Sequence, residues 1–233
     1  MSPFYIKTKD EDQIKRTFDE WGVCVLLPSM FDISNMSTEA ANIMVNVENE
    51  NNDNYVAGYA NKVFIKSSLD NQIANYPEIC RFFGEPLLQS LFEKITCGKG
   101  TFCEDVYMTK EIYNHERLAR NGFLHFDRNW AFKVIVYLSD VEEGCGPFSV
   151  VPKSHGLGKS LRLLGWEKYK AFENIPNRAT IDFPDISKLL GDTQPIYGKA
   201  GTVIIFDSDI FHLGGVVKPE KERWIIRSHS RYW

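Results

Sequence analysis

The chain has 233 residues, of which 43% are hydrophobic and 13% aromatic, and its formal net charge is -4. A chain of this length and apolar content suits one large globular domain, and β-rich barrels commonly use as much sequence without dividing. The slight acidity excludes a strongly basic surface for nucleic acid, and no apolar run approaches the roughly 20 residues that cross a bilayer. We therefore expect one domain over residues 1–233, with no nucleic-acid partner and no membrane insertion.

The five cysteines are odd in number and lack the C-x-x-C spacing of a zinc site. This pattern also argues against a disulfide framework. The N-terminal stretch "MSPFYIKTKDEDQ" is too polar for a secretory signal peptide. We expect a cytoplasmic protein whose thiols are buried or idle, at Cys24, Cys80, Cys97, Cys103 and Cys145.

Residues 1–100 are expected to form a mainly helical support. Apolar residues at helical spacing come first, and the β-branched run "VCVLLP" follows them as a strand. A second helix is expected after Phe31, with Ser37 as its candidate cap. We expect the Asn- and Glu-rich stretch beyond it to be a surface loop, in which residues 46–54 are a candidate lid. Two short helices are expected over residues 77–95.

Residues 101–233 have the composition of a β-rich unit. Their β-branched and aromatic runs alternate with turns that contain glycine, as in "DVYMTK", "AFKVIVYL", "GTVIIFD" and "RWIIRSHS". One helical pattern interrupts them, near residues 157–175. Six or more short strands with a single insertion predict a barrel or a sandwich rather than alternating βαβ units.

His125 and Asp127 stand two apart in the apolar stretch "GFLHFDRNW". Alternate residues of a strand leave the same face, so both side chains can bind one ion. An isolated pair of this kind is more often a simple hydrogen-bonded pair, and a second motif is needed. His212 provides it, because it follows the buried run "GTVIIFDSDIF" and precedes two glycines. Two histidines and one carboxylate form the facial triad of non-haem Fe(II) oxygenases.

Arg223 lies eleven residues after His212 and opens the strand "RWIIRSHS". A guanidinium at this place can hold a carboxylate through two parallel hydrogen bonds. An ordinary surface arginine is the alternative reading. Arg227 lies four residues further on the same strand face, which makes it the second candidate for a carboxylate clamp.

The order of these motifs resembles the phytanoyl-CoA dioxygenase (PhyH-like) family of Fe(II)/2-oxoglutarate-dependent oxygenases. The resemblance is carried by "HFD", by "VYLSDVEEGCGPFSVVPKSH", by "GTVIIFDSDIFHLGG" and by the arginine that opens the last strand. It implies a mainly β fold with flanking helices, built on a double-stranded β-helix of the jelly-roll, cupin-like kind. It further implies that His125, Asp127 and His212 bind iron and that Arg223 binds the distal carboxylate of 2-oxoglutarate.

The activity implied by the resemblance is the hydroxylation of an unactivated C–H bond in a small molecule. Such an enzyme consumes O2 and 2-oxoglutarate and forms succinate and CO2, while the protein sets orientation and keeps water out. Asp127 disfavours halogenation, because halogenating relatives carry a small residue at this place. Two departures from the family pattern concern the substrate side and local packing: Leu124 replaces the usual tryptophan, and Lys153 replaces the glycine of Gly-Ser-His.

Further residues are assigned less directly. Tyr137 lies in the strand after the HxD motif, where the family places a co-substrate contact. Lys133 lies four residues earlier and is therefore expected on the same face of that strand. His229 is two residues after Arg227 and is expected on the same strand face, although it can equally be a structural polar residue with its hydrogen bonds satisfied. His155 is better explained as a structural residue that forms a hydrogen bond at a turn. His115 is expected to be a solvated surface residue, and Tyr107 to be part of the core packing.

The substrate is not named by these motifs. The insertion over residues 156–180 has five basic side chains against two acidic ones, which favours an anionic substrate if this segment borders the site. A solvated helix face is the alternative.

For the whole protein, the alternative is a cupin-like isomerase or hydrolase that needs no 2-oxoglutarate. Arg223 separates the two, since only the oxygenase needs a carboxylate clamp. A non-catalytic binding barrel is a third reading, disfavoured by the intact set of ligands.

Overall fold

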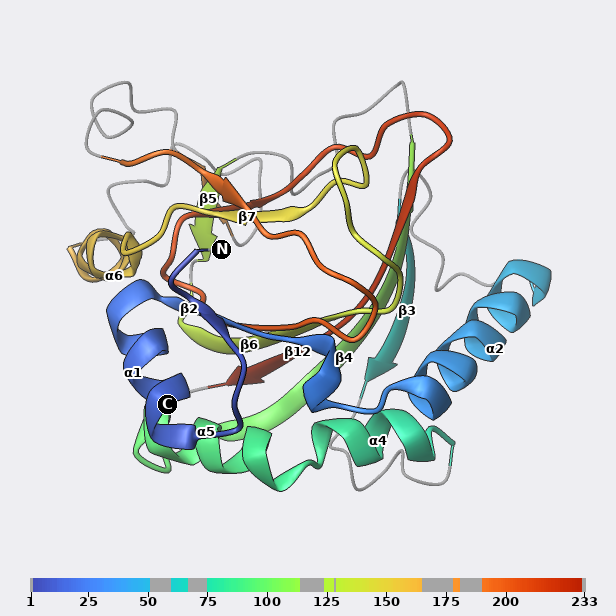
Figure 1. The fold of residues 1–233 in the computed structure, drawn as a ribbon, viewed down its shortest axis with the longest axis horizontal. Coiled ribbons are helices and arrows are strands. Elements are labelled where there is room, and N and C mark those ends of the chain that lie inside the picture. Colours follow the sequence, from blue (N-terminus) through green and yellow to red (C-terminus); the bar gives the residue numbers. More distant parts are fainter. Residues whose placement is uncertain are drawn as a thin grey trace.

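The computed structural model describes residues 2–50, 60–66, 75–113, 124–127, 129–164, 178–180 and 190–231. Two β-sheets face each other across a common interior (Figure 1). The larger sheet consists, in spatial order, of β1 (Tyr5–Ile6), β2 (Val23–Leu26), β10 (Val203–Asp207), β6 (Ala131–Tyr137), β12 (Glu222–Arg231), β4 (Thr101–Ile112) and β3 (Ala60–Lys66). The smaller sheet consists of β8 (Arg178–Thr180), β5 (His125–Asp127), β11 (His212–Gly214), β7 (Phe148–Val150) and β9 (Gln194–Pro195).

All neighbouring strands run antiparallel except β1 and β2. The chain crosses repeatedly between the sheets, since β4, β6, β10 and β12 lie in one and β5, β7 and β11 in the other. This is the arrangement of a double-stranded β-helix, and the fold class predicted from the sequence is confirmed.

Alternation along the central strands divides the core into two parts. In β6, Val134 and Val136 pack on the helical side of the larger sheet, whereas Ile135 and Tyr137 face the interior between the sheets. β12 follows the same rule, with Ile226 on the helical side and Ile225 inside. The odd-numbered residues of β6 and β12 therefore line the space between the sheets.

Helices cover the outer face of the larger sheet (Figure 1). The N-terminal half supplies α1 (Glu11–Trp21), the short η1 (Pro28–Met30), α2 (Ser34–Glu50), α4 (Pro77–Phe83) and α5 (Pro86–Thr96). Aromatic rings join the two layers: the ring of Phe132 on β6 lies 5.9 Å from that of Phe18 and 5.8 Å from that of Phe92. The pair of helices expected over residues 77–95 is confirmed as α4 and α5.

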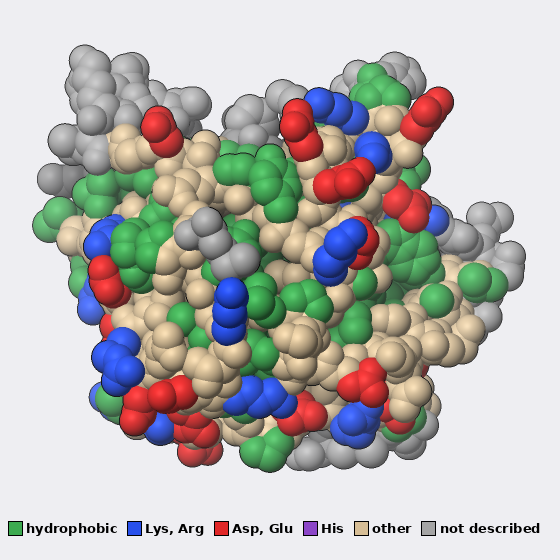
Figure 2. All heavy atoms as spheres, in the orientation of Figure 1, with side chains coloured by type: hydrophobic (Ala, Val, Ile, Leu, Met, Phe, Trp, Pro, Cys, Tyr) green, Lys and Arg blue, Asp and Glu red, His purple; other side chains and the backbone are tan. Residues whose placement is uncertain are grey.

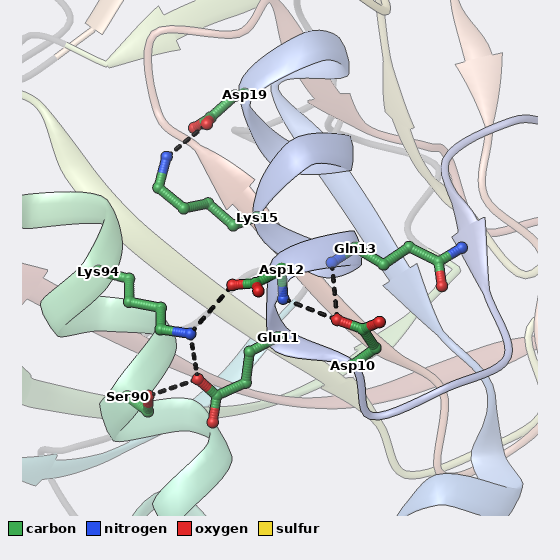
Figure 3. A network of polar contacts seen from close by, with 8 residues as sticks. All are labelled: Asp10, Glu11, Asp12, Gln13, Lys15, Asp19, Ser90 and Lys94. Atoms are coloured by element: carbon green, nitrogen blue, oxygen red, sulfur yellow. Dashed lines mark hydrogen bonds and ion pairs between the residues drawn. The ribbon is translucent and has the colours of Figure 1, made fainter.

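Charged groups fix α1 against α5 (Figure 3). Asp10 caps α1, because its carboxylate accepts from the backbone N–H groups of Asp12 and Gln13 at 3.0 and 3.1 Å. The Lys94 ammonium on α5 bridges Glu11 at 2.7 Å and Asp12 at 3.2 Å. The acidic first turn of α1 also interacts favourably with the helix dipole.

Two features of the N-terminal half differ from the expectation. The second helix begins at Ser34 instead of after a Ser37 cap, and the Asp32 carboxylate accepts from the Ser34 backbone N–H at 3.0 Å. It also continues to Glu50, so residues 46–50 are helical rather than part of a loop. Glu is a good helix former and Asn a tolerated one, so a stretch rich in both is compatible with a helix as well as with a loop, which explains the error. The rest of the candidate lid lies outside the described residues.

Within the described ranges, no helix is long and apolar enough to cross a membrane. On the face shown in Figure 2, basic and acidic side chains are interspersed over the larger part of the surface. Four of the five cysteines are buried, as expected, and Cys97 is exposed.

Candidate metal centre

Three potential metal ligands converge between the two sheets. His125 and Asp127 leave the same face of β5, and His212 opens the neighbouring strand β11 directly opposite His125. One nitrogen or oxygen atom of each residue lies within 4.8 Å of those of the other two, and the two imidazole rings are 4.4 Å apart. Tertiary pairing thus brings together residues separated by 85 positions in the sequence.

The orientation of His212 is fixed by the backbone. Its Nδ1 lies 2.7 Å from the carbonyl oxygen of Ile210, to which it donates, and this leaves Nε2 for a metal. Burial, together with the neighbouring His125, holds the pKa of His212 well below its usual value. The imidazole is therefore neutral at physiological pH, the form that binds metal ions. The rings of Phe148 and Phe206 lie 5.5 and 5.2 Å from it and form an apolar surround.

Asp127 is held as a carboxylate. Burial by itself raises the pKa of this group, but the opposing effect of Lys133, His212 and His125 outweighs it and leaves the pKa well below its usual value. The Lys133 ammonium on β6 forms an ion pair with the Asp127 carboxylate. Lys133 thus lies beside the ligands, on the strand for which the family resemblance implied a co-substrate contact.

The loop between β10 and β11 is anchored at several points. Ser208 joins it to the turn after β5, since Asp127 N–H donates to the Ser208 carbonyl at 2.9 Å and Ala131 N–H to its hydroxyl at 2.6 Å. Phe211 N–H donates to the Ser154 hydroxyl at 2.8 Å. These contacts hold the backbone on either side of His212.

The same loop is clamped by helix α6 (His155–Leu163). The Arg162 guanidinium donates to both oxygens of the fully buried Asp209 carboxylate, at 2.6 and 2.8 Å. Gly158 allows the close approach, because a Cβ atom there would lie 1.8 Å from the Asp209 carbonyl oxygen. These supporting residues could not be predicted from the sequence, since only tertiary contact distinguishes them from surface polar groups.

Arg223 lies at the start of β12 with its side chain 3% exposed. Its guanidinium contacts the Glu111 carboxylate on β4 and the Gly146 carbonyl oxygen. Its Nε is buried and has no hydrogen-bond partner among the described residues. The burial excludes the alternative of an ordinary surface arginine, and the sequence gave no indication of the partner Glu111.

Arg227 lies on the same face of β12, nearer the triad. It is opposite Ile135 in register, and the next interior pair along the strands is His229 with Lys133. The guanidinium carbon of Arg227 is 5.5 Å from the ring centre of Tyr107, whose ring is 4.9 Å from that of His229. Within the described part, Arg227 Nε and His229 Nε2 are buried without a hydrogen-bond partner.

Tyr137 is fully buried and its hydroxyl is satisfied by the backbone. It donates to the Ile196 carbonyl at 2.8 Å and accepts from the Phe148 N–H at 3.3 Å. The expected contact of Tyr137 with the co-substrate stays a prediction.

The other candidates lie away from the triad or outside the described residues. His155 Nε2 is 3.2 Å from the Asp19 carbonyl oxygen, which fits the structural reading. Lys153, at the place of the family's glycine, has a φ of 67°, and its ammonium is 2.9 Å from a Glu20 oxygen. The left-handed backbone explains why glycine suits this position. His115 belongs to a segment outside the described residues.

The donor set fits Fe(II). Two imidazole nitrogens and one carboxylate oxygen on one side of an ion leave further coordination positions open, as in the 2-His-1-carboxylate oxygenases. The described cluster contains no cysteine, so it differs from the thiolate-rich sites of structural zinc.

Comparisons with known proteins agree with this geometry. The sequence profile named Phytanoyl-CoA dioxygenase (PhyH) matches residues 31–224. The chain belongs to the phytanoyl-CoA dioxygenase family. The match includes all three triad residues and Arg223 and ends before Arg227. No curated protein matches this chain.

Solved structures share the fold of this phytanoyl-CoA dioxygenase family member. The epimerase SnoN, in complex with Fe3+, alpha ketoglutarate and nogalamycin RO, is 14% identical, with a TM-score of 0.67 and coverage of 95% of this chain and 83% of that one. EctD from S. alaskensis, with 2-oxoglutarate and 5-hydroxyectoine, is 15% identical, with a TM-score of 0.64 and coverage of 100% and 81%. HygX from Streptomyces hygroscopicus, with nickel, 2-oxoglutarate and hygromycin B, is 14% identical, with a TM-score of 0.56 and coverage of 93% and 85%.

Proposed function

We propose that the protein is an Fe(II)/2-oxoglutarate-dependent dioxygenase that hydroxylates an unactivated C–H bond of a small molecule. The observation that carries this proposal is the convergence of His125, Asp127 and His212 within 4.8 Å between the sheets. Family membership supports it, as does the presence of iron and alpha ketoglutarate with SnoN and of 2-oxoglutarate with EctD. Per turnover, one O2 and one 2-oxoglutarate convert R–H to R–OH and yield succinate and CO2.

Bound iron and 2-oxoglutarate would supply the oxidising chemistry, and the chain's own residues prepare the site. His125, His212 and Asp127 would hold the metal, with the His212 imidazole neutral and the Asp127 carboxylate ionised. The Ile210 carbonyl keeps the His212 ring turned so that Nε2 faces the ligand set. Phe148 and Phe206 beside that ring limit the access of water. Exclusion of water protects an oxidising centre from side reactions.

Arg223 is our candidate for binding the distal carboxylate of 2-oxoglutarate. The proposal is supported by its eleven-residue spacing from His212 and by the burial of its side chain on β12. The buried Nε without a partner in the described part of the chain supplies a free donor. Arg227 is the second candidate, and Tyr137 is proposed to contact the co-substrate through its ring, because its hydroxyl is engaged.

The anionic character of the substrate remains a proposal. One of the basic residues that suggested it, Arg162, is neutralised by Asp209 and is not available to a ligand. Support now comes from Arg227, a buried cation that interacts electrostatically with Asp127 of the triad. An anionic group of the substrate would be stabilised on that side of the site.

The test is an anaerobic titration of the Fe(II) protein with 2-oxoglutarate. We expect a weak visible charge-transfer band from the chelate, and succinate in the presence of O2 and a broad substrate pool. Arg223→Ala should weaken 2-oxoglutarate binding more than Arg227→Ala, and the reverse order would transfer the clamp to Arg227. No band and no succinate would contradict the proposal and favour a metal-dependent isomerase or hydrolase.

A further inference from the structure

Arg223 is already paired with a carboxylate that belongs to the protein. Glu111 on β4 is directly opposite Arg223 in the register of β4 and β12, and one of its oxygens contacts Nη2 of the guanidinium. The two side chains are 3% and 7% exposed. Because the pair is buried, water screens it little, and the guanidinium charge is largely neutralised within the protein.

This pairing affects any incoming dicarboxylate. A distal carboxylate that reaches Arg223 arrives beside the Glu111 carboxylate, and like charges at close range in a buried site repel. The Gly146 carbonyl already accepts from Nη1, so both terminal nitrogens have a partner. Within the described part of the chain, further N–H groups of the guanidinium, Nε–H among them, are still free to donate. A ligand that uses them lies beside the Glu111 carboxylate or displaces it, and either costs affinity.

We propose that Glu111 is an internal competitor for the co-substrate's distal carboxylate and thereby sets the affinity of the site for dicarboxylic 2-oxo acids. The inference rests on the proposed function and on Arg223 as the clamp. When Glu111 moves away, the Gly146 carbonyl keeps Arg223 in place. That carbonyl is fixed by tight packing, because a Cβ atom on Gly146 would lie 2.6 Å from the Gly215 carbonyl oxygen.

Calorimetric titration of the metal-loaded protein under anaerobic conditions tests this competition. The variant Glu111→Gln keeps the shape of the side chain and removes its charge. Two ligands are compared: 2-oxoglutarate and 2-oxopentanoate, which has the same chelating end but no distal carboxylate. We expect Glu111→Gln to bind 2-oxoglutarate about tenfold more tightly than the wild type, with the affinity for 2-oxopentanoate unchanged.

Glu222→Gln is the matched control. It causes the same change in net charge one residue before Arg223, but the Glu222 side chain is 51% exposed and pairs with Lys110 at 3.6 Å. We expect it to leave both affinities unchanged, because water screens its charge. Should Glu111→Gln fail to fold, Glu111→Asp draws the carboxylate back by one methylene group and should tighten 2-oxoglutarate binding in the same direction.

Three outcomes would overturn the inference. Unchanged or weaker binding of 2-oxoglutarate to folded Glu111→Gln would make Glu111 a structural partner of Arg223. Equal tightening of both ligands would show that the effect does not act through the distal carboxylate. Failure of the wild type and the variant alike to bind 2-oxoglutarate would instead contradict the proposed function, and the inference with it.

Discussion

The Lys133 ammonium on β6 forms an ion pair with the Asp127 carboxylate on β5, and so connects the two sheets at the metal centre. Their side chains are 13% and 16% exposed, which leaves the pair only weakly screened. A positive charge in this position competes with a metal cation for the same carboxylate.

Replacement of Lys133 by Gln should therefore raise the affinity for divalent metal. We expect Mn(II) or Co(II) to bind several-fold more tightly, roughly the effect of removing one nearby like charge from a partly buried site. Metal titration without 2-oxoglutarate measures this separately from any role of Lys133 toward the co-substrate. Lys199→Gln is a suitable control, since Lys199 pairs with Asp140 at 2.7 Å on the exposed surface. Weaker metal binding by Lys133→Gln would show that Lys133 orients Asp127.

Loss of a ligand should have the opposite effect. We expect metal affinity to fall by more than about a hundredfold in His125→Ala, Asp127→Ala and His212→Ala, because each variant lacks one of the three donors. Changes to residues that only hydrogen-bond to metal ligands lower the affinity by up to about a hundredfold, and loss of a ligand should cost more. Equilibrium dialysis against Co(II) measures it. His155→Ala should leave metal affinity unchanged, because His155 contacts the Asp19 carbonyl instead. A variant of any triad residue that binds metal normally would remove that residue from the proposed ligand set.

Two glycines of α6 should respond oppositely to alanine. A Cβ atom on Gly158 would lie 1.8 Å from the Asp209 carbonyl oxygen, whereas one on Gly156 would meet nothing within 4 Å. Gly158→Ala should lower the free energy of unfolding by about 1–3 kcal/mol through overpacking. Gly156→Ala should raise it by up to about 1 kcal/mol, because alanine favours the helix. Urea denaturation distinguishes them, and equal effects would mean that α6 does not pack tightly on this loop.

Asp207 should make stability depend on pH. Burial raises the pKa of Asp207 to about 6, although the Asp209 backbone N–H opposes the rise. Because the folded state then binds more protons than the unfolded chain, the free energy of unfolding should fall as the pH rises from about 4 to 6, by at most about 3 kcal/mol.

Asp207→Asn should abolish that part of the pH dependence while the side chain still accepts from Asp209 N–H. Urea denaturation of both proteins at pH 4.5 and 7 measures the difference. If the two proteins lose stability in parallel over this interval, Asp207 does not titrate with a raised pKa.

Much of the metal centre could be predicted from the sequence alone. Alternation along a strand places His125 and Asp127 on one face, a consequence of backbone geometry that needs no tertiary information. The motifs around His212 and Arg223 pointed to the family, and the profile match over residues 31–224 confirms it. The end of α2 at Glu50 and the strand β3 were missed, because short polar or mixed segments carry weak periodicity.

Only the tertiary structure decided which groups support the site. Arg223 and Glu111 are 112 positions apart, and Arg162 and Asp209 are 47 apart. Their pairing depends on strand register and on the docking of α6, which no local pattern encodes. The sequence determined the chemical groups available to the metal and the faces they occupy. The fold decided which of the charged groups are neutralised by a neighbour, since that depends on distances that arise only when the sheets close on each other.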